Sequence, residues 1–255
     1  MVAQELKSAG FKVYAAARRV DRMADLEKDG ITPVALDLTR DGSIAACVNT
    51  ILSKEKSIDV LVNNAGYGSY GAIEDVPLEE GRRQFEVNLF GTARLIRLVT
   101  PAMREQHYEK IVNISSMGGK IWTKFGGWYH ATKYAVEGLS DCLRMELQPF
   151  GIDVVVVEPG GIKTDRGLIA AENLKKTSTN GAYAEMANKA ADGMIKNYSG
   201  DLLSKPALIA KTVRKAVTKC RPRTRYLVGF GAKLMVWTHR LFGDRVFDWV
   251  LRTFS

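Results

Sequence analysis

Residues 152–157 read Ile-Asp-Val-Val-Val-Val, and this run of β-branched side chains decides the fold class. A strand with apolar residues on both faces is typical of a parallel sheet that helices cover on both sides. Residues 58–62 and 111–114 are similar short apolar runs, and the segments between the runs have helical spacing. We therefore predict an α/β fold of the Rossmann type, a doubly wound parallel sheet with helices on both faces.

The same alternation extends toward both ends of the chain. Residues 11–17 and 33–36 are further strand-length runs, and residues 2–9 and 43–54 have helical spacing. We expect one domain over residues 1–255. Within it, residues 165–205 are predicted to fold over the end of the sheet as a substrate-loop region. Residues 225–255 are predicted to form a carboxyl-terminal extension with a short strand and amphipathic helix.

Composition excludes several classes of protein. With 46% hydrophobic and 25% charged residues in 255, the chain reads as an ordinary soluble globular protein. The net charge of +9 suits nucleic acid, an anionic membrane surface or a phosphate-rich small ligand, but no basic block interleaved with aromatics supports nucleic acid. No apolar stretch approaches the roughly 18 residues of a membrane span. Three isolated cysteines, Cys47, Cys142 and Cys220, predict neither disulfides nor a metal site, and indicate a reducing, cytoplasmic setting.

The residues that point to chemistry are Tyr129 and Lys133, in Tyr-His-Ala-Thr-Lys. Four residues of spacing place both side chains on one helix face. A phenol has a pKa of about 10, so a fixed cation is needed to stabilise its phenolate near neutral pH. By itself the spacing also fits a solvated helix pair. Ser116, however, lies thirteen positions earlier, at the carboxyl end of a predicted strand, where parallel sheets bind ligands.

Five features together resemble the classical short-chain dehydrogenase/reductase family, over about residues 10–165. In chain order they are Asn63-Asn64-Ala65-Gly66 after a strand, Asn88 in Val-Asn-Leu-Phe-Gly, Ser116, Tyr129 with Lys133, and Pro159-Gly160 followed by Thr164. The resemblance implies an oxidoreductase that interconverts a ketone or aldehyde and an alcohol by hydride transfer with a nicotinamide cofactor.

The resemblance also implies a role for each catalytic residue. Tyr129 would be the general acid that protonates the carbonyl oxygen, and Ser116 would hold that oxygen. Lys133 would lower the pKa of Tyr129 and bind the nicotinamide ribose. Asn88 would bind a water that connects Lys133 to solvent, although a buried amide at a helix kink is an alternative.

For the cofactor, NADP(H) is preferred and NAD(H) remains possible. Where an NAD enzyme carries an acidic residue, after residues 11–17, this chain has Arg18 and Arg19, which suit a 2′-phosphate. Solvated surface arginines are the alternative. By resemblance, the cofactor-binding residues are Arg18, Arg19, Asp37, Leu38, Asn64, Ala65, Gly66, Tyr129, Lys133, Pro159, Gly160, Ile162 and Thr164.

The substrate is expected to be an apolar small molecule. The aromatic and aliphatic residues around the predicted site, which could equally be core or subunit contacts, are Trp122, Phe125, Trp128, Leu168, Met186 and Met194. The tail is similar to that of the steroid- and retinoid-type branch of the family. Its apolar and basic face could contact a membrane surface or pack on the domain. Family resemblance implies a homodimer or homotetramer.

The chain departs from its family at the amino terminus. A complete member begins with a strand and a Gly-x-x-x-Gly-x-Gly turn that holds the pyrophosphate, whereas this chain opens on a predicted helix. We expect the first strand and turn to be missing, with Met1 an internal methionine preceded by about twenty residues. The neighbours of that strand would then expose backbone edges. The alternative is a chain that begins at Met1 and acts as a non-catalytic partner or decayed enzyme.

Overall fold

The computed structural model describes residues 1–106 and 109–253. Its strands are β1 (Tyr14–Ala17), β2 (Thr32–Ala35), β3 (Val60–Asn63), β4 (Lys110–Ile114), β5 (Asp153–Pro159) and β6 (Arg225–Val228). Its α-helices are α1 (Val2–Ser8), α2 (Ala24–Lys28), α3 (Asp41–Glu55), α4 (Leu78–Phe85), α5 (Gly91–Gln106), α6 (Gly127–Leu147), α7 (Asp165–Ser178), α8 (Ala184–Ser199), α9 (Ala207–Thr218) and α10 (Ala232–Thr253). All strand pairs are parallel, so the predicted α/β class is confirmed.

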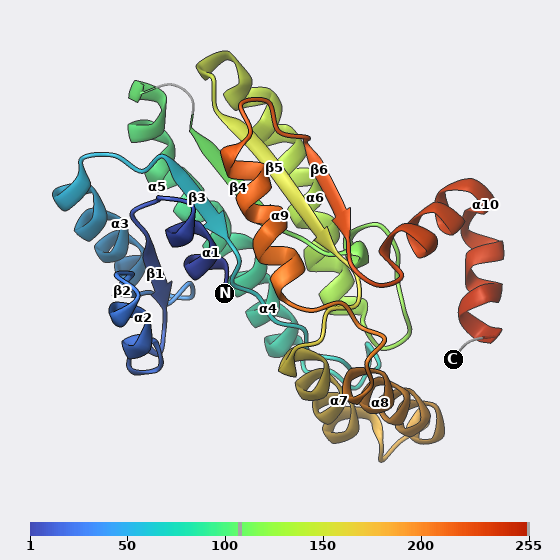
Figure 1. Ribbon diagram of the computed structural model, residues 1–255. Coiled ribbons are helices and arrows are strands. Elements are labelled where there is room, and N and C mark those ends of the chain that lie inside the picture. Colours follow the sequence, from blue (N-terminus) through green and yellow to red (C-terminus); the bar gives the residue numbers. More distant parts are fainter. Residues whose placement is uncertain (107–108, 254–255) are drawn as a thin grey trace.

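The strands form two sheets. β1 pairs with β2, and β3, β4, β5 and β6 follow one another in a second sheet. Within the described residues no strand lies between β1 and β3. Both strands run in the same direction in Figure 1, and each has a free edge toward the other. Within the described residues, β1 and β3 are therefore each paired with a strand on one side only.

Helices cover the strands on both faces, as the apolar runs predicted (Figure 1). Strand side chains alternate between faces, so Ile111 and Val154 pack among residues of α3 and α5, while Val112 and Val155 face α1 and α9. All four are at most 2% exposed. β4 and β5 are thus central strands, and they support the loops that follow their carboxyl ends.

β2 forms the outer edge of the smaller sheet, and its proline fits that position. The Thr32 amide donates to the Val13 carbonyl at 2.9 Å, and the Leu36 amide donates to the Ala17 carbonyl at 3.1 Å. Alternate residues of a parallel strand bond to the same neighbour, so the nitrogen of Pro33 faces away from β1. Proline has no amide hydrogen to lose there.

Residues 165–205 cross the carboxyl ends of the second sheet. α7 and α8 pack against each other there, beyond the arrowheads of the strands in Figure 1. Their shared core includes Leu174, Ala187 and Ala191. The segment returns to the sheet through a bridge between Ile162 and Ser204.

The carboxyl-terminal extension contacts the domain through both β6 and α10. Arg225 of β6 donates hydrogen bonds to Glu137 at 2.8 Å and Asp141 at 2.7 Å, both on α6. In α10, Phe247 is fully buried and its ring centroid lies 5.4 Å from that of Trp122. Gly243, at φ +73°, kinks the helix.

Much of α10 nevertheless stands clear of the body of the molecule in Figure 1. Trp237, Leu241 and Trp249 are largely exposed, so packing on the domain accounts for only part of its apolar face. Among the described residues, none of the helices has both the length and the apolarity to cross a membrane.

Candidate active site

Ser116 lies directly beyond the carboxyl end of β4, where the chain turns into a short 3-10 helix, Met117–Gly119. Its hydroxyl caps this helix by accepting the Gly118 amide at 3.0 Å. The same hydroxyl approaches the Pro159 carbonyl of β5 at 3.4 Å and hydrogen-bonds the Tyr129 side chain. Ser115, the neighbouring serine, is buried on the other side of the chain. Ser116 is therefore held in place at the end of two central strands.

Tyr129 and Lys133 occupy successive turns of α6, as their spacing predicts. Lys133 is buried, and its ammonium donates to the Ile114 carbonyl at the end of β4 at 2.9 Å. An ammonium has three N–H donors. Within residues 1–106 and 109–253 one of them is used in this bond, so two remain for a ligand. The structure brings Ser116, Tyr129 and Lys133 together.

Among the described residues, the groups that shift the pKa of Tyr129 do not include Lys133, so the expectation that Lys133 lowers this pKa stays a prediction. Burial raises the pKa of the phenol, and the Ser116 hydrogen bond and the charge of Arg166 only partly oppose that effect. Lys133 responds in the opposite sense. The pKa of Lys133 is lowered to about 8, because burial and the charge of Arg166 lower it by more than Glu137, one turn along the helix, raises it. The pair therefore contains a protonated phenol and an ammonium that titrates near neutral pH.

Asn88 lies in a five-residue π-helical segment, Glu86–Phe90, and is buried. Its side chain accepts the Tyr67 amide at 3.0 Å, donates to the Tyr67 carbonyl at 2.8 Å and donates to the Thr132 hydroxyl at 3.0 Å. These bonds fit the alternative of a buried amide at a helix irregularity. They also fix the loop after β3 against α6, beside Lys133.

The Asn63–Gly66 segment begins with a buried residue and continues with exposed ones. Asn63 is buried and donates to Asn113 of β4 at 2.8 Å. Asn64 and Ala65 are exposed at the strand end. A Cβ atom on Gly66 would lie 3.1 Å from the Asn88 side-chain oxygen and 3.6 Å from the Lys133 nitrogen. Glycine thus leaves the backbone close to the reactive pair.

The segment after β5 lies beside Ser116. A Cβ atom on Gly160 would come within 2.4 Å of the Phe230 carbonyl, so only glycine fits there. Pro159 ends the strand, Ile162 is buried, and Thr164 is half-buried at the start of α7. These four residues lie at the same end of the sheet as Ser116.

The predicted adenosine-binding residues lie on the smaller sheet. Arg18 and Arg19 are exposed just beyond β1. Asp37 accepts two hydrogen bonds from Thr39, which lower its pKa together with the charge of Arg18. Leu38 is buried against Gly91, where a Cβ atom would lie 2.6 Å from the leucine Cβ. An exposed guanidinium beside a carboxylate fits both a phosphate site and a solvated pair.

Sequence reasoning missed several residues of the site. His130 is buried, and its ring contacts the Gly118 carbonyl at 2.9 Å and the Thr123 amide at 3.0 Å, which pins the loop after Ser116 to α6. The Tyr70 ring lies 5.9 Å from Tyr129. Arg166 acts on both titrating groups through its charge. No periodic pattern marks such residues, because each is brought in by tertiary contacts.

Two aromatics that were candidates for a substrate pocket pack elsewhere. Trp122 donates to Asp248 of α10 at 2.9 Å, and the Trp128 ring meets Phe85 edge-on at 6.4 Å. Phe125 does lie near the site end, in the cluster formed by α7 and α8. The core alternative therefore holds for Trp122 and Trp128.

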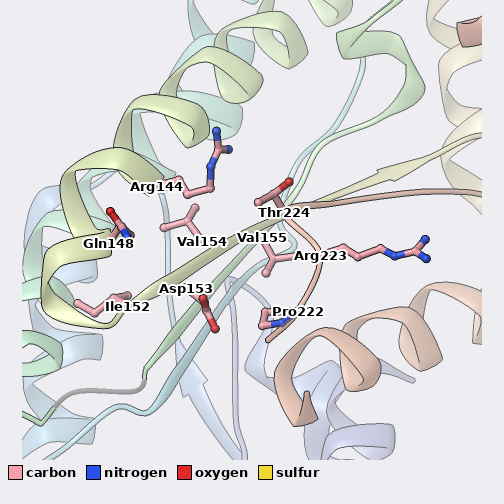
Figure 2. A pocket seen from close by; sticks show the side chains of 9 residues that line it. All are labelled: Arg144, Gln148, Ile152, Asp153, Val154, Val155, Pro222, Arg223 and Thr224. Carbon is pink, nitrogen blue, oxygen red and sulfur yellow. The ribbon is translucent and has the colours of Figure 1, made fainter. Parts of the chain in front are cut away.

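A hollow of about 190 Å³ lies at the opposite end of the sheet (Figure 2). It is bordered by Arg144, Asp153 and Arg223, near the amino end of β5. Ligands of open parallel sheets bind at the carboxyl ends of the strands, so this hollow is not the candidate active site.

Comparison with known proteins agrees with this geometry. Residues 1–174 match the family model described as short chain dehydrogenase. The chain belongs to this family. It is 33% identical to a probable short-chain type dehydrogenase/reductase, VdlC, of Helicobacter pylori, over 97% of this chain and 90% of that protein.

Solved structures agree as well. A short-chain dehydrogenase from Streptomyces avermitilis is similar with a TM-score of 0.80 and 33% identity, over 94% of this chain and 87% of that one. An actinorhodin polyketide ketoreductase variant solved with NADPH is similar with a TM-score of 0.72 and 27% identity, over 88% of each chain. The protein is thus an oxidoreductase of the short-chain dehydrogenase/reductase type with a Rossmann-type fold. The comparisons confirm neither a missing first strand and glycine-rich turn nor the steroid- and retinoid-type branch.

The bonds of Asn88 generate a stability prediction. Asn88→Ala leaves the Tyr67 amide and carbonyl without their side-chain partners, so the free energy of unfolding should fall by about 1–3 kcal/mol. Urea unfolding followed by circular dichroism measures the change. Asn64→Ala, at an exposed position of the same loop, is the matched control and should change stability by less than about 0.5 kcal/mol. Equal effects of the two variants would contradict the structural role of Asn88.

Proposed function

We propose that this protein is an NADP(H)-dependent enzyme that interconverts an apolar ketone or aldehyde and the corresponding alcohol. The observation that carries the proposal is the convergence of the Ser116 hydroxyl, the Tyr129 phenol and the Lys133 ammonium at the carboxyl end of β4. A purely structural role would seldom require these three groups to lie together, whereas carbonyl reduction uses all three.

In reduction, the nicotinamide supplies the hydride to the carbonyl carbon. Tyr129 donates its proton to the carbonyl oxygen, and its raised pKa keeps that proton in place until negative charge develops on the oxygen. Ser116 donates a hydrogen bond to the same oxygen. Lys133 stabilises the phenolate left on Tyr129 by its charge. Oxidation of the alcohol runs through the same groups in reverse.

The residues present fit most of the cofactor. The two remaining N–H groups of Lys133 suit ribose hydroxyls, and Gly66 and Gly160 keep backbone close to the nicotinamide end. Arg18 and Arg19 would hold the 2′-phosphate, with Asp37 and Leu38 beside the adenine. For the pyrophosphate between them, residues 1–106 and 109–253 hold no turn of the form Gly-x-x-x-Gly-x-Gly.

The substrate proposal rests on the surroundings of Tyr129. Tyr129 lies close enough to Tyr70 and Tyr198 to raise the pKa of both through its charge. Tyr70, Phe125 and Met194 all pack against the core that α7 and α8 share. A surface made of these aromatic rings and the methionine thioether suits an uncharged, apolar carbonyl compound.

Assembly and location belong to the same proposal. The helices that carry Asn88 and Tyr129 also expose Phe90, Leu98, Tyr134 and Met145, and we propose that these helices pair subunits into a homodimer or homotetramer. The exposed apolar and basic side chains of α10 are proposed to allow peripheral contact with a membrane surface. The proposed location is the cytoplasm, since Cys142 and Cys220 are free and exposed.

The second candidate is a non-catalytic binding protein with this fold. NADPH titration by fluorescence separates the two candidates. Saturable binding supports the enzyme, and no binding at millimolar NADPH supports the non-catalytic protein.

Tyr129→Phe should abolish turnover and leave NADPH binding intact, because only the proton-bearing oxygen is removed. We expect a loss of at least about 100-fold in kcat in a screen of aldehydes and ketones, with an unchanged fluorescence titration. Tyr134→Phe, which alters a surface tyrosine of the same helix, should retain full activity. Substantial turnover by Tyr129→Phe would exclude this acid.

The pKa of Lys133 sets a pH limit. Its pKa lies below the usual value, so the charged form is lost as pH rises through about 8, and kcat/KM for reduction should fall there. Arg166→Gln removes a positive charge that lowers this pKa, so the fall should move to higher pH. Lys176→Gln makes the same charge change at an exposed site of α7 and should leave the profile in place. If the fall in kcat/KM stayed at the same pH in Arg166→Gln, the assignment of this fall to Lys133 would be contradicted.

Arg18→Asp should reduce the preference for NADPH over NADH by about tenfold or more, because charge-assisted bonds to the 2′-phosphate are lost and a carboxylate repels it. Dissociation constants for both cofactors measure the preference. Arg22→Asp, an exposed arginine of the next turn, controls for net charge. An unchanged ratio in Arg18→Asp would support the alternative of a solvated surface arginine.

A further inference from the structure

Two buried glutamates lie against each other between α6 and β5. Glu137 belongs to α6 and Glu158 to β5, and their side chains hydrogen-bond each other. They are 4% and 3% exposed. Neither has a part in the reaction proposed above, although Glu137 follows Lys133 by one helical turn. We call these two side chains the glutamate pair.

Two cations border the glutamate pair, and each contacts both of its members. The Lys120 ammonium lies 3.1 Å from the Glu137 carboxyl and 3.9 Å from the Glu158 carboxyl. The Arg225 guanidinium of β6 lies 2.8 Å from Glu137 and 3.3 Å from Glu158. Both cations are thus closer to Glu137, and the charge of Glu158 is the less well compensated of the two.

The contact between the two carboxyl groups requires a proton. An ionised carboxylate only accepts hydrogen bonds, so two carboxyl groups can bond each other only if one of them is protonated. In the described part of the chain, the Oε1 atoms of Glu137 and Glu158 are both buried without a hydrogen-bond donor. Burial and the charge of Glu137 raise the pKa of Glu158 to about 7, although Lys120 and Arg225 oppose this effect. Glu158, with its longer contacts, is therefore the better holder of the proton.

The other titratable side chains around the pair contact its cations or one another. Arg225 also donates to Asp141 of α6 at 2.7 Å. Within residues 1–106 and 109–253, the groups that move the pKa of Glu158 are Glu137, Lys120 and Arg225. The outer members of the cluster are Arg144 of α6 and His239 and Asp244 of α10.

The charge of Glu137 acts on Lys133 from the next turn of the same helix. Burial and the charge of Arg166 lower the pKa of Lys133, and among the described residues Glu137 is the group that raises it. Lys133 therefore depends on a negative charge at Glu137 to remain an ammonium. A neutral Glu158 leaves this charge on Glu137 and holds the carboxylate by a hydrogen bond.

We propose that Glu137 and Glu158 share one proton, and that the single negative charge left on Glu137 keeps Lys133 in its ammonium form. Both glutamates are positioning residues, because they act on the reaction through Lys133. The inference rests on the proposed function only in its last step, in which the ammonium supports turnover. The alternatives are two ionised glutamates paired with Lys120 and Arg225, or two carboxylates bridged by a water, and neither has a proton to lose near neutral pH.

NMR follows both titrations without turnover. The full chain is labelled with ¹³C at glutamate Cδ and lysine Cε and is titrated from about pH 5 to about pH 9, above the ordinary range of glutamate. The two resonances are identified by their loss in Glu158→Gln and in Lys133→Arg. In the parent, one glutamate carboxyl should titrate near pH 7 and be absent from Glu158→Gln. The Lys133 resonance should titrate near pH 8.

Matched glutamine variants test how the charges depend on one another. Glu137→Gln should lower the Lys133 midpoint by about 0.5 pH unit or more and move the Glu158 midpoint toward its ordinary value, because Glu137 raises both pKa values. Glu158→Gln keeps a donor to Glu137, so the Lys133 midpoint should stay in place. Glu146→Gln makes the same change at an exposed position of α6 and should move neither midpoint.

Two results would overturn the proposal. One is the lack of a carboxyl that titrates between about pH 6 and pH 8 and disappears in Glu158→Gln. The other is an unmoved Lys133 midpoint in Glu137→Gln, since a merely structural glutamate would change stability and leave that midpoint alone. Circular dichroism checks folding, and if Glu137→Gln is unfolded, Glu137→Asp, which draws the charge back by one methylene, should lower the midpoint by a smaller amount.

Turnover provides a separate readout. The fall of kcat/KM at high pH should move to lower pH in Glu137→Gln, in the direction opposite to that expected for Arg166→Gln. The expected NMR titrations in a chain that reduces no carbonyl compound would refute the proposed function and leave the shared proton established.

Discussion

The hydrogen bond from the Lys133 ammonium to the Ile114 carbonyl is the constraint on which the site depends. It joins the helix that carries Tyr129 to the end of the strand that leads to Ser116. Because Lys133 is buried, its charge is compensated chiefly by this carbonyl and by Glu137, and burial lowers its pKa. The geometry of the reactive groups is thereby tied to the pairing of β4 with β5.

Two asparagines and a histidine surround that bond. Asn88 secures the loop after β3, Asn63 joins β3 to β4, and His130 secures the loop after Ser116. Each makes hydrogen bonds to backbone or to another amide, so the site is held by polar contacts inside an apolar frame. These bonds restrain the loops at the sheet end, which are normally the most mobile parts of such a fold.

The sequence predicted the strands and most helices because periodicity reports burial on one or two faces. It also predicted the meeting of Ser116, Tyr129 and Lys133, since helix spacing and the carboxyl ends of parallel strands fix their positions. It could not predict Arg166, whose effect arises from the return of α7 over the sheet end. Nor could it predict the raised pKa of Tyr129, because desolvation depends on neighbours distant in sequence. The separation of the sheets was anticipated only through family resemblance.

Arg225 contacts Glu137 and Asp141, so the carboxyl-terminal extension helps to hold α6, the helix that carries Tyr129 and Lys133. Glu137 follows Lys133 by one helical turn, so a cation on β6 reaches the helix that positions the ammonium. A shortened chain that ends before Arg225 would lose the positive charge that faces Glu137 and Asp141 of α6. A chain that ends within the exposed part of α10 would keep it.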